Sequence, residues 1–400
     1  MTAPVQAGSR ASTPEVFLVA GEESGDRLGA ALMRALRERT AGRVRFAGVG
    51  GREMAGEGLT SLFSIDDLAI IGFSAIPRRI PHVLRRIRLA ARTVIARRPD
   101  VLVVIDSPDF TLRIARRVRA ADASIPIVEY VSPSVWAWRP GRARVLWGFV
   151  DHILALLPFE PDAHRRLGGP PCTYVGHPLA AQVADLRPNA QEARRRLEAP
   201  PVLLMLPGSR TGEIARLLAV FAGAVELVRD RITALEVVVP TTPHLVAAIR
   251  KATAHWPTPP RIVTESADKH AAFRIARVAL AKSGTVTLEL ALAGVPTVAA
   301  YKVSALEYYA VGRRILKRLP SIILANLLLG ENVIPELLQQ HCTAEQLAEA
   351  LLPLFDDTPQ RRRQIEAFAR LDAIMEIGAS APAARAADIV LAAAARVSPS

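Results

Sequence analysis

Two carboxylates follow an apolar run in the first half of the chain. The run DVLVVI leads directly to Asp106, and Asp109 comes three residues later. A carboxylate at the tip of a strand can accept the proton of a substrate hydroxyl when it reaches hydrogen-bonding distance. Asp106 is therefore our candidate general base. The alternatives are that Asp106 is a structural turn residue and that Asp109 is the N-cap of the helix expected from FTLRIARRV.

The turn GEESGDRLGA follows the first apolar run, EVFLVA, and predicts a helix that begins near Ser24 or Asp26. Backbone N–H groups at a helix start bind anions, but Glu23 and its acidic neighbours would repel a phosphate. We assign Ser24 and Gly25 to substrate binding and expect the acidic residues to bind sugar hydroxyls, with a capped turn as the alternative. The turn has no GxGxxG spacing, so it does not support a dinucleotide site.

The segment YVSPSVWAWRPGR follows another apolar run and concentrates aromatic and basic side chains in one loop. It contains Trp136, Trp138, Arg139 and Arg142. Indole rings can pack against a sugar or an acyl chain, and guanidinium groups can bind phosphate. Aromatic side chains in loops also serve as plugs of the core, so both interpretations stay open.

Two strand-to-helix turns in the second half are candidates for binding a diphosphate. GSRTGEI follows PVLLMLP and supplies Arg210, and KSGTVTLEL follows RVALA and supplies Ser283, Gly284 and Thr285. A helix N-terminus carries positive potential, and arginine can form paired hydrogen bonds to phosphate. Glu289 lies one helical turn after Thr285, where its carboxylate can accept both ribose hydroxyls. The alternative for Glu289 is an ordinary surface carboxylate.

Short, almost continuously apolar runs alternate with amphipathic stretches along the whole chain. This pattern predicts parallel strands covered by helices on both faces, so we expect an α/β protein with two doubly wound, Rossmann-like domains. The polar stretch before Pro200 and Pro201 predicts a boundary near residues 185–200. We expect a disordered tail at 1–14, domains at 15–185 and 200–375, and a terminal helix at about 381–396 that packs back on the first domain. Two such domains would face each other across a cleft.

Composition limits the classes of partner. The 400 residues carry a net charge of +13, which predicts an acidic partner, but the aromatic content is low for a protein that stacks on nucleic acid. Cys172 and Cys342 are the two cysteines and lack the spacing of metal ligands. Apolar runs long enough to span a bilayer are absent from the sequence. We expect a cytoplasmic protein that does not bind nucleic acid.

The wording of the motifs resembles the lipid-A-disaccharide synthase family. AGEESGDRLGA, IDSPDF, YVSPSVWAWRPGR, LPGSR and KSGTVTLEL occur in that order, within a resemblance that spans roughly residues 20–339. The resemblance implies a GT-B fold and an inverting transfer that needs neither a metal nor another cofactor. It also implies UDP-2,3-diacylglucosamine as donor and 2,3-diacylglucosamine 1-phosphate as acceptor. A UDP-sugar epimerase of the same fold and a non-catalytic protein that docks on anionic membrane or RNA are the alternatives.

The resemblance also assigns residues. The essential aspartate of the family falls on Asp106, and its UDP-binding elements fall on Arg210, Ser283 to Thr285 and Glu289. Asn326, which we also assign to UDP binding, corresponds to the asparagine of a Pro-Asn pair in the family, although Ala325 here replaces the proline. Lys282 stands where many relatives carry a small residue, and it is either a phosphate contact or a surface charge.

Because both implied substrates carry acyl chains, the segment LAIIGFSAIPRRIPHVLRRIRLA is a candidate for contact with the membrane. Ile70, Ile71 and Phe73 would enter the interface, and Arg85 and Arg86 would hold anionic head groups. The alternative is a core loop followed by a solvated helix. We expect a peripheral protein on the cytoplasmic face of the inner membrane, and the oligomeric state, a homodimer included, stays open.

Overall fold

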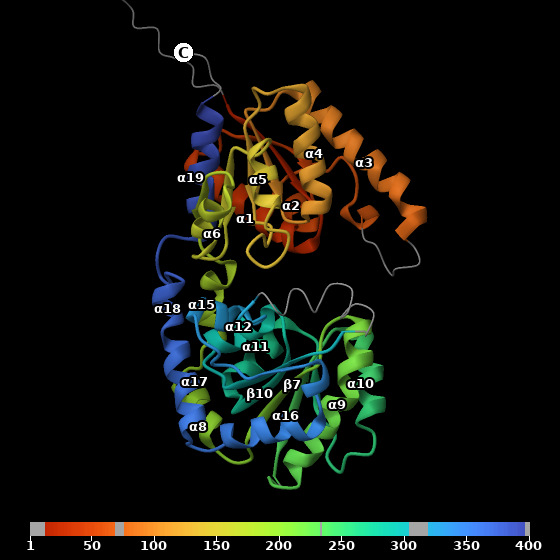
Figure 1. Ribbon diagram of the computed structural model, residues 1–400, viewed down its shortest axis with the longest axis vertical. Helices are drawn as coiled ribbons and strands as arrows, with labels where there is room; N and C mark the ends of the chain where they lie inside the picture. The colour runs from red at the N-terminus through yellow and green to blue at the C-terminus, as the bar shows by residue number, and fades with distance from the viewer. Residues whose placement is uncertain (1–12, 69–75, 233, 304–318, 397–400) are drawn as a thin grey trace, which may run out of the picture. The chain divides into compact units, whose positions relative to one another are not determined.

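The computed structural model describes residues 13–68, 76–232, 234–303 and 319–396 (Figure 1). The chain divides into two compact units. Unit 1 comprises Met1–Pro178 and Ala379–Ser400, and unit 2 comprises Leu179–Gly378. Each unit contains one six-stranded sheet in which every described pair of neighbouring strands is parallel. The predicted α/β class with two doubly wound sheets is confirmed.

The sheet of unit 1 has the strand order β2-β1-β3-β4-β5-β6. Its neighbouring interior strands β1, β3 and β4 are buried along their whole length, as expected for a parallel sheet with helices on both faces. The strands are β1 (Glu15–Ala20), β2 (Arg45–Val49), β3 (Val101–Ile105), β4 (Ile127–Tyr130), β5 (His152–Ala155) and β6 (Cys172–Tyr174).

Helices cover both faces of this sheet. One face packs against α1 (Glu23–Arg39) and α19 (Pro382–Ala395), and α19 contributes Ala386, Ala387 and Val390 to that core. The other face packs against α3 (Ile76–Arg97) and α4 (Pro108–Ala121). The last helix of the chain thus lies beside the first in unit 1 (Figure 1). The remaining helices of this unit are α2 (Arg52–Gly56), η1 (Ile65–Leu68), α5 (Arg142–Trp147) and α6 (Glu160–Leu167).

The sheet of unit 2 has the strand order β12-β11-β10-β7-β8-β9. Its strands are β7 (Val202–Leu206), β8 (Glu236–Pro240), β9 (Arg261–Val263), β10 (Val278–Lys282), β11 (Thr297–Tyr301) and β12 (Glu336–Leu338). Its helices are η3 (Pro178–Gln182), α7 (Val183–Leu186), α8 (Ala190–Leu197), α9 (Thr211–Arg229), η4 (Pro243–Leu245), α10 (Val246–Ala252), α11 (Ser266–Ile275), α12 (Thr285–Leu292), α15 (Leu324–Leu329), η6 (Gln339–His341), α16 (Ala344–Leu351), η7 (Leu352–Leu354), α17 (Pro359–Ala369) and α18 (Leu371–Ile374).

Within the described ranges, no helix combines the length and the apolar character that a membrane span requires. Ile70, Ile71 and Phe73 lie outside the described residues. Arg85 is exposed on α3, whereas Arg86 turns back toward the body of unit 1. Its guanidinium group donates to Asp67 over 2.5 Å and lies 4.9 Å from the centre of the Phe63 ring.

Candidate active site

Asp106 follows β3 in a backbone conformation that favours glycine. Its φ is +53° and that of Ser107 is +45°, so two consecutive residues with side chains occupy the left-handed region. Such residues typically cost about 1–3 kcal/mol each and persist only where the surroundings hold them in place. The Asp106 N–H donates to the carbonyl oxygen of Tyr130 over 3.0 Å, which ties this turn to the neighbouring strand β4.

Several further contacts fix the Asp106 carboxylate. The Ser107 N–H donates to Oδ1 over 2.8 Å, and the Ser24 hydroxyl donates to Oδ2 over 2.9 Å. Thr111 holds the main chain by donating to the Asp106 carbonyl over 2.6 Å. A side chain at Gly21 would place its Cβ 2.8 Å from the Cβ of Ser107, so glycine is needed for this close approach. The carboxylate is therefore rigidly oriented at the strand tip.

The other residues predicted around the first turn have structural contacts. Asp26 is 2% exposed and accepts the N–H groups of Gly51, Glu53 and Met54, so it caps the start of α2 instead of its own helix. A Cβ at Gly25 would lie 3.2 Å from the Ile105 carbonyl oxygen, so this glycine lets α1 approach β3. Glu23 is exposed in the first turn of α1. Ser24 is the residue of this turn that contacts Asp106.

The aromatic loop after β4 places its two tryptophans in different environments. Trp136 packs edge-on against Phe159, with ring centres 5.1 Å apart, and donates to Glu160 over 3.2 Å. Trp138 is 37% exposed, and the Arg139 guanidinium group lies 4.1 Å from its ring centre. Packing therefore accounts for Trp136, whereas Trp138 and Arg139 form a stacked pair open to a ligand.

Asp109 lies in the first turn of α4, where it pairs with Arg142 over 2.9 Å. Its side chain is 81% exposed, whereas that of Arg142 is 21% exposed. The Asp109 carboxylate is thus paired with a cation at the surface, whereas the Asp106 carboxylate accepts hydrogen bonds from Ser24 and Ser107. This difference favours Asp106 as the base over Asp109.

Two buried carboxyl groups of unit 1 were not among the candidates predicted from the sequence. Glu129 on β4 is 2% exposed, and its Oε2 atom has no hydrogen-bond partner in the structure. Burial holds the pKa of Glu129 well above its usual range, with the nearby charge of Arg142 opposing the shift. Burial likewise raises the pKa of Glu160 to about 7, although Trp136 and two backbone N–H groups donate to it.

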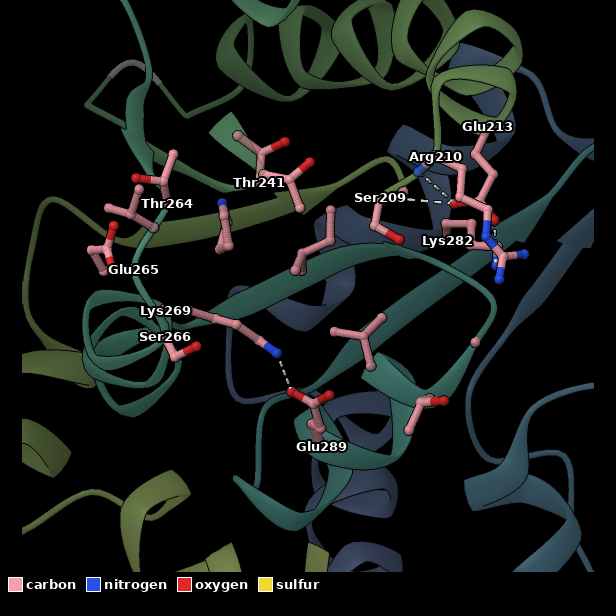
Figure 2. Close-up of a pocket in the computed structure, with 18 residues that line it drawn as sticks. Ser209, Arg210, Glu213, Thr241, Thr264, Glu265, Ser266, Lys269, Lys282 and Glu289 are labelled. Carbon is pink, nitrogen blue, oxygen red and sulfur yellow. Dashed lines mark hydrogen bonds and ion pairs between the residues drawn. The ribbon is translucent and has the colours of Figure 1, made fainter. Parts of the chain in front are cut away.

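Unit 2 contains a cavity of about 480 Å³ at the carboxyl ends of its strands. Ligands of open α/β sheets bind at this edge. The cavity is lined by loops that follow β7, β8, β9 and β10 together with the first turns of α11 and α12 (Figure 2). Its polar lining residues are Ser209, Arg210, Glu213, Thr241, Thr242, Thr264, Glu265, Ser266, Lys269, Lys282, Thr285 and Glu289.

Two lysine–glutamate pairs line this cavity. Lys269 donates to Glu289, and Lys282 lies 3.0 Å from Glu213. Burial would raise the pKa of Glu213, but the hydrogen bond and charge of Lys282 outweigh it, so this pKa lies below its usual range. In Figure 2, Arg210 and Lys282 lie at one end of the cavity and Thr264 and Glu265 at the other.

The contacts of the GSR turn differ from our expectation. The N–H groups of Ser209 and Arg210 donate to Glu213 over 3.1 and 3.4 Å, so these amides are occupied. Arg210 can therefore contribute its exposed guanidinium group, but its amide already has a partner. The hydroxyl oxygens of Thr241 and Thr242 are buried with no hydrogen-bond partner in the structure, so they are available to a ligand.

Four of the six residues assigned to UDP binding by resemblance line the cavity: Arg210, Gly284, Thr285 and Glu289. Ser283 and Asn326 do not appear in its lining. Ser283 is 6% exposed, and its hydroxyl donates to the Ile322 carbonyl over 3.4 Å.

The side chain of Asn326 is fully occupied within unit 2. Its carbonyl oxygen accepts the N–H groups of Val333 and Ile334, and its amide donates to the Ile334 carbonyl and to Glu336. An asparagine side chain has two donor hydrogens and two acceptor lone pairs, so these four bonds use all of them. The Asn326 side chain thus stabilises the segment that leads into β12.

Sequence reasoning did not single out Lys269, Glu213, Thr241 or Thr242. Lys269 and Glu289 are 20 residues apart and meet because α11 and α12 both begin at the same edge of the sheet. Lys269 follows Ser266 at the start of α11. A basic residue just after an expected strand-to-helix turn is the sequence feature that could have identified Lys269. Among the described residues, no group of three or more His, Cys, Asp or Glu side chains is arranged to hold a metal ion.

Comparisons with known proteins identify the family of the chain. The family model described as Lipid-A-disaccharide synthetase matches residues 16–390. A lipid-A-disaccharide synthase from Rhodopseudomonas palustris (strain BisB18) is 63% identical over 377 residues, covering 94% of this chain and 95% of that protein.

Solved structures show the same fold at low sequence identity. The calicheamicin glycosyltransferase CalG4 has a TM-score of 0.60 at 19% identity, covering 97% of this chain and 100% of that one. UDP-GlcNAc 2-epimerase from Neisseria meningitidis, bound to UDP-GlcNAc, has a TM-score of 0.60 at 12% identity, with coverage of 96% and 100%. The two Rossmann-like sheets and the nearly full-length family match together show that the chain belongs to the lipid-A-disaccharide synthase family of GT-B glycosyltransferases.

Proposed function

We propose that the chain transfers 2,3-diacylglucosamine from UDP-2,3-diacylglucosamine to 2,3-diacylglucosamine 1-phosphate. The products are a β-1,6-linked disaccharide 1-phosphate and UDP, and the configuration at the anomeric carbon is inverted. Membership of the family supports the donor and acceptor classes. The rigid carboxylate of Asp106 in unit 1 and the cation-lined cavity of unit 2 supply the two kinds of group that this reaction needs.

Asp106 is the proposed general base. Its carboxylate takes the proton of the acceptor 6-hydroxyl as the oxygen attacks the anomeric carbon from the face opposite UDP. The Ser24 hydroxyl and the Ser107 N–H orient the carboxylate through bonds of 2.9 and 2.8 Å. A preoriented base avoids the loss of conformational freedom during the reaction, which is a large part of what an active site contributes.

The cavity of unit 2 is the proposed site of the UDP group. Glu289 accepts the ribose hydroxyls with the carboxylate oxygen that Lys269 leaves free. The bare start of α12 at Gly284 and Thr285 and the guanidinium group of Arg210 face the diphosphate. These positive groups stabilise the charge that develops on the departing diphosphate, as oxyanion-binding groups do in other transfers.

The deciding experiment is incubation with both acylated substrates followed by mass analysis. We expect a tetraacyl disaccharide 1-phosphate that forms only when donor and acceptor are both present. Conversion of the UDP-sugar without an acceptor would instead identify an epimerase. Binding of anionic surfaces without conversion of either substrate would identify a docking protein.

We further propose that the chain works as a peripheral protein on the cytoplasmic face of the inner membrane, with α3 toward the lipid. Ile80 and Leu89 of α3 are 48% and 42% exposed, and Arg85 and Arg88 are exposed on the same helix. Apolar side chains flanked by cations favour an anionic interface, each cation adding about 1 kcal/mol near the surface.

This attachment can be tested with vesicles that contain an anionic lipid. Changing Arg85 and Arg88 together to Gln should weaken binding and flatten its dependence on salt. Arg86→Gln is the matched control, because Arg86 already pairs with Asp67 and should contribute little. Equal binding by the double variant and the control would place the contact elsewhere.

A further inference from the structure

Lys282 is the last residue of β10, and its ammonium group lies inside the cavity of unit 2. The Nζ atom is 3.0 Å from Oε1 of Glu213 and 5.3 Å from the centre of the Tyr301 ring. The lysine and glutamate side chains are 19% and 15% exposed, so water screens this pair only in part. The ammonium group is therefore held in one place before any ligand binds.

That place coincides with the start of α12. A Cβ added to Gly284 would lie 3.3 Å from Nζ of Lys282, so the ammonium group stands directly over the bare backbone that precedes Thr285. Gly284 is the N-cap of α12, and no side chain caps the helix there. An anion that accepts the free N–H groups of this helix would lie against the ammonium group.

A second helix start in this cavity, that of α9, is less open to an anion. The N–H groups of Ser209 and Arg210 before α9 already donate to Oε2 of Glu213. The same carboxylate holds Lys282 through Oε1, so Glu213 occupies one turn and orients the cation over the other. The charge distribution thus favours a phosphate at α12.

We propose that Lys282 binds the diphosphate of the nucleotide and neutralises its charge as it departs, a role that rests on the proposed function of the cavity. An ammonium group has three N–H donors, and Glu213 is the hydrogen-bonding partner described for it in the resolved ranges of unit 2. The remaining donors point to phosphate oxygens without a break in the Glu213 pair. Lys282 thus binds the phosphate groups, whereas Lys269 acts at the ribose by holding Glu289.

The test measures the affinity of the full chain for uridine, UMP and UDP by calorimetry. Lys282→Met should weaken UDP by about tenfold or more, since hydrogen bonds to charged groups carry this magnitude, and should leave uridine within twofold. Lys269→Met is the matched control in the same cavity and should change all three affinities by a similar factor. Lys282→Arg, which keeps the charge, should retain UDP affinity within a few-fold.

Removal of Lys282 also leaves Glu213 unpaired, and its charge alone would repel a phosphate. The comparison is therefore repeated in a Glu213→Gln background, where Gln can still accept the turn amides. If Lys282 contacts the phosphate, adding Lys282→Met to Glu213→Gln still weakens UDP selectively.

Equal UDP affinity of the single and double variants in that background would overturn the proposal, as would equal losses for uridine and UDP in Lys282→Met. A wild-type chain that binds none of the three ligands would instead overturn the proposed function of the cavity itself. These outcomes separate the role of Lys282 from the assignment of the site.

Discussion

The glutamate carboxyl groups near the strand ends have opposite electrostatic surroundings in the two units. In unit 1, Glu129 and Glu160 are buried with no ion pair described for either, and burial raises the pKa of each. In unit 2, Glu213 and Glu289 each pair with a lysine, and the pKa of Glu213 is lowered. One architecture therefore supports two electrostatic designs: unit 1 holds buried carboxyl groups near the partly buried carboxylate of Asp106, and unit 2 lines its cavity with lysine–glutamate pairs.

The backbone shows the same contrast. The turn after β3 holds two left-handed residues with side chains, Asp106 and Ser107, whereas the turn after β7 in unit 2 places its positive φ, +127°, on Gly208. Local strain is tolerated where an orientation must be held. Under the proposed function, unit 1 positions one group and unit 2 receives a charged ligand. Loss of turnover should therefore be concentrated at one residue of unit 1, whereas loss of UDP affinity should be distributed over several residues of unit 2.

The largest effect is expected at Asp106. Asp106→Asn should lower turnover by about 10²-fold or more, the range for loss of a general base, while UDP affinity stays unchanged. Steady-state rates and calorimetry measure the two quantities. Asp109→Asn serves as the control, because Asp109 is paired with Arg142 at the surface, and it should retain turnover within a few-fold. Similar losses in both variants would contradict a single base.

Gly21→Ala tests whether the turn after β3 is held by close packing. The added Cβ would meet that of Ser107 at 2.8 Å, and overpacking of this kind usually costs about 1–3 kcal/mol. Denaturant unfolding should show this loss, and turnover should fall because Asp106 is displaced. UDP affinity should not change, since the cavity belongs to unit 2. Wild-type stability and turnover would show that the turn tolerates the methyl group.

In unit 2, each single change should weaken UDP by a moderate factor. Arg210→Ala and Glu289→Ala should each reduce UDP affinity by about tenfold, the usual size of one charge-assisted hydrogen bond, and acceptor affinity less. Calorimetry with UDP and with the acceptor measures both. If either substitution abolished binding altogether, the contribution would be concentrated in one residue and the contrast with unit 1 would fail.

The last prediction concerns pH. The pKa of Glu160 is about 7 in the folded chain against 4.5 without burial, so the folded state keeps its proton while the unfolded state loses it. The free energy of unfolding should therefore decline as pH rises from about 4.5 to 7. Glu160→Gln cannot ionise and should show a shallower decline in denaturant titrations at pH 5 and pH 8. A decline as steep as that of the wild type would assign it to other groups.

Apolar patterning in the sequence predicted the sheets well. EVFLVA corresponds to β1 residue for residue, the run DVLVVI contains β3, and RVALA covers β10 except for its last residue, Lys282. These strands are legible because both faces of a parallel sheet are buried, so the apolar run is continuous. The expected strand ends then indicated where catalytic and binding residues should lie. Asp106 and Arg210 were predicted because each follows such an end.

Contacts between distant segments could not be predicted in this way. Asp26 caps a helix that begins 26 residues later, and the Asn326 side chain forms its hydrogen bonds with residues 333–336. Both depend on how loops meet across the fold, which periodicity does not encode. The left-handed turn at Asp106 was equally hidden, because neither Asp106 nor Ser107 is glycine and its stability comes from Thr111 and Tyr130.

The placement of α19 has a consequence for how the chain is made. Unit 1 is encoded first, yet its core includes Ala386, Ala387 and Val390 from the far end of the chain. During synthesis at about 5–20 residues per second, the sheet of unit 2 can form before α19, the last helix that packs on the sheet of unit 1, has been made. Unit 2 is therefore synthesised in full before unit 1 is finished, and a premature stop before residue 382 would damage the unit that was begun first.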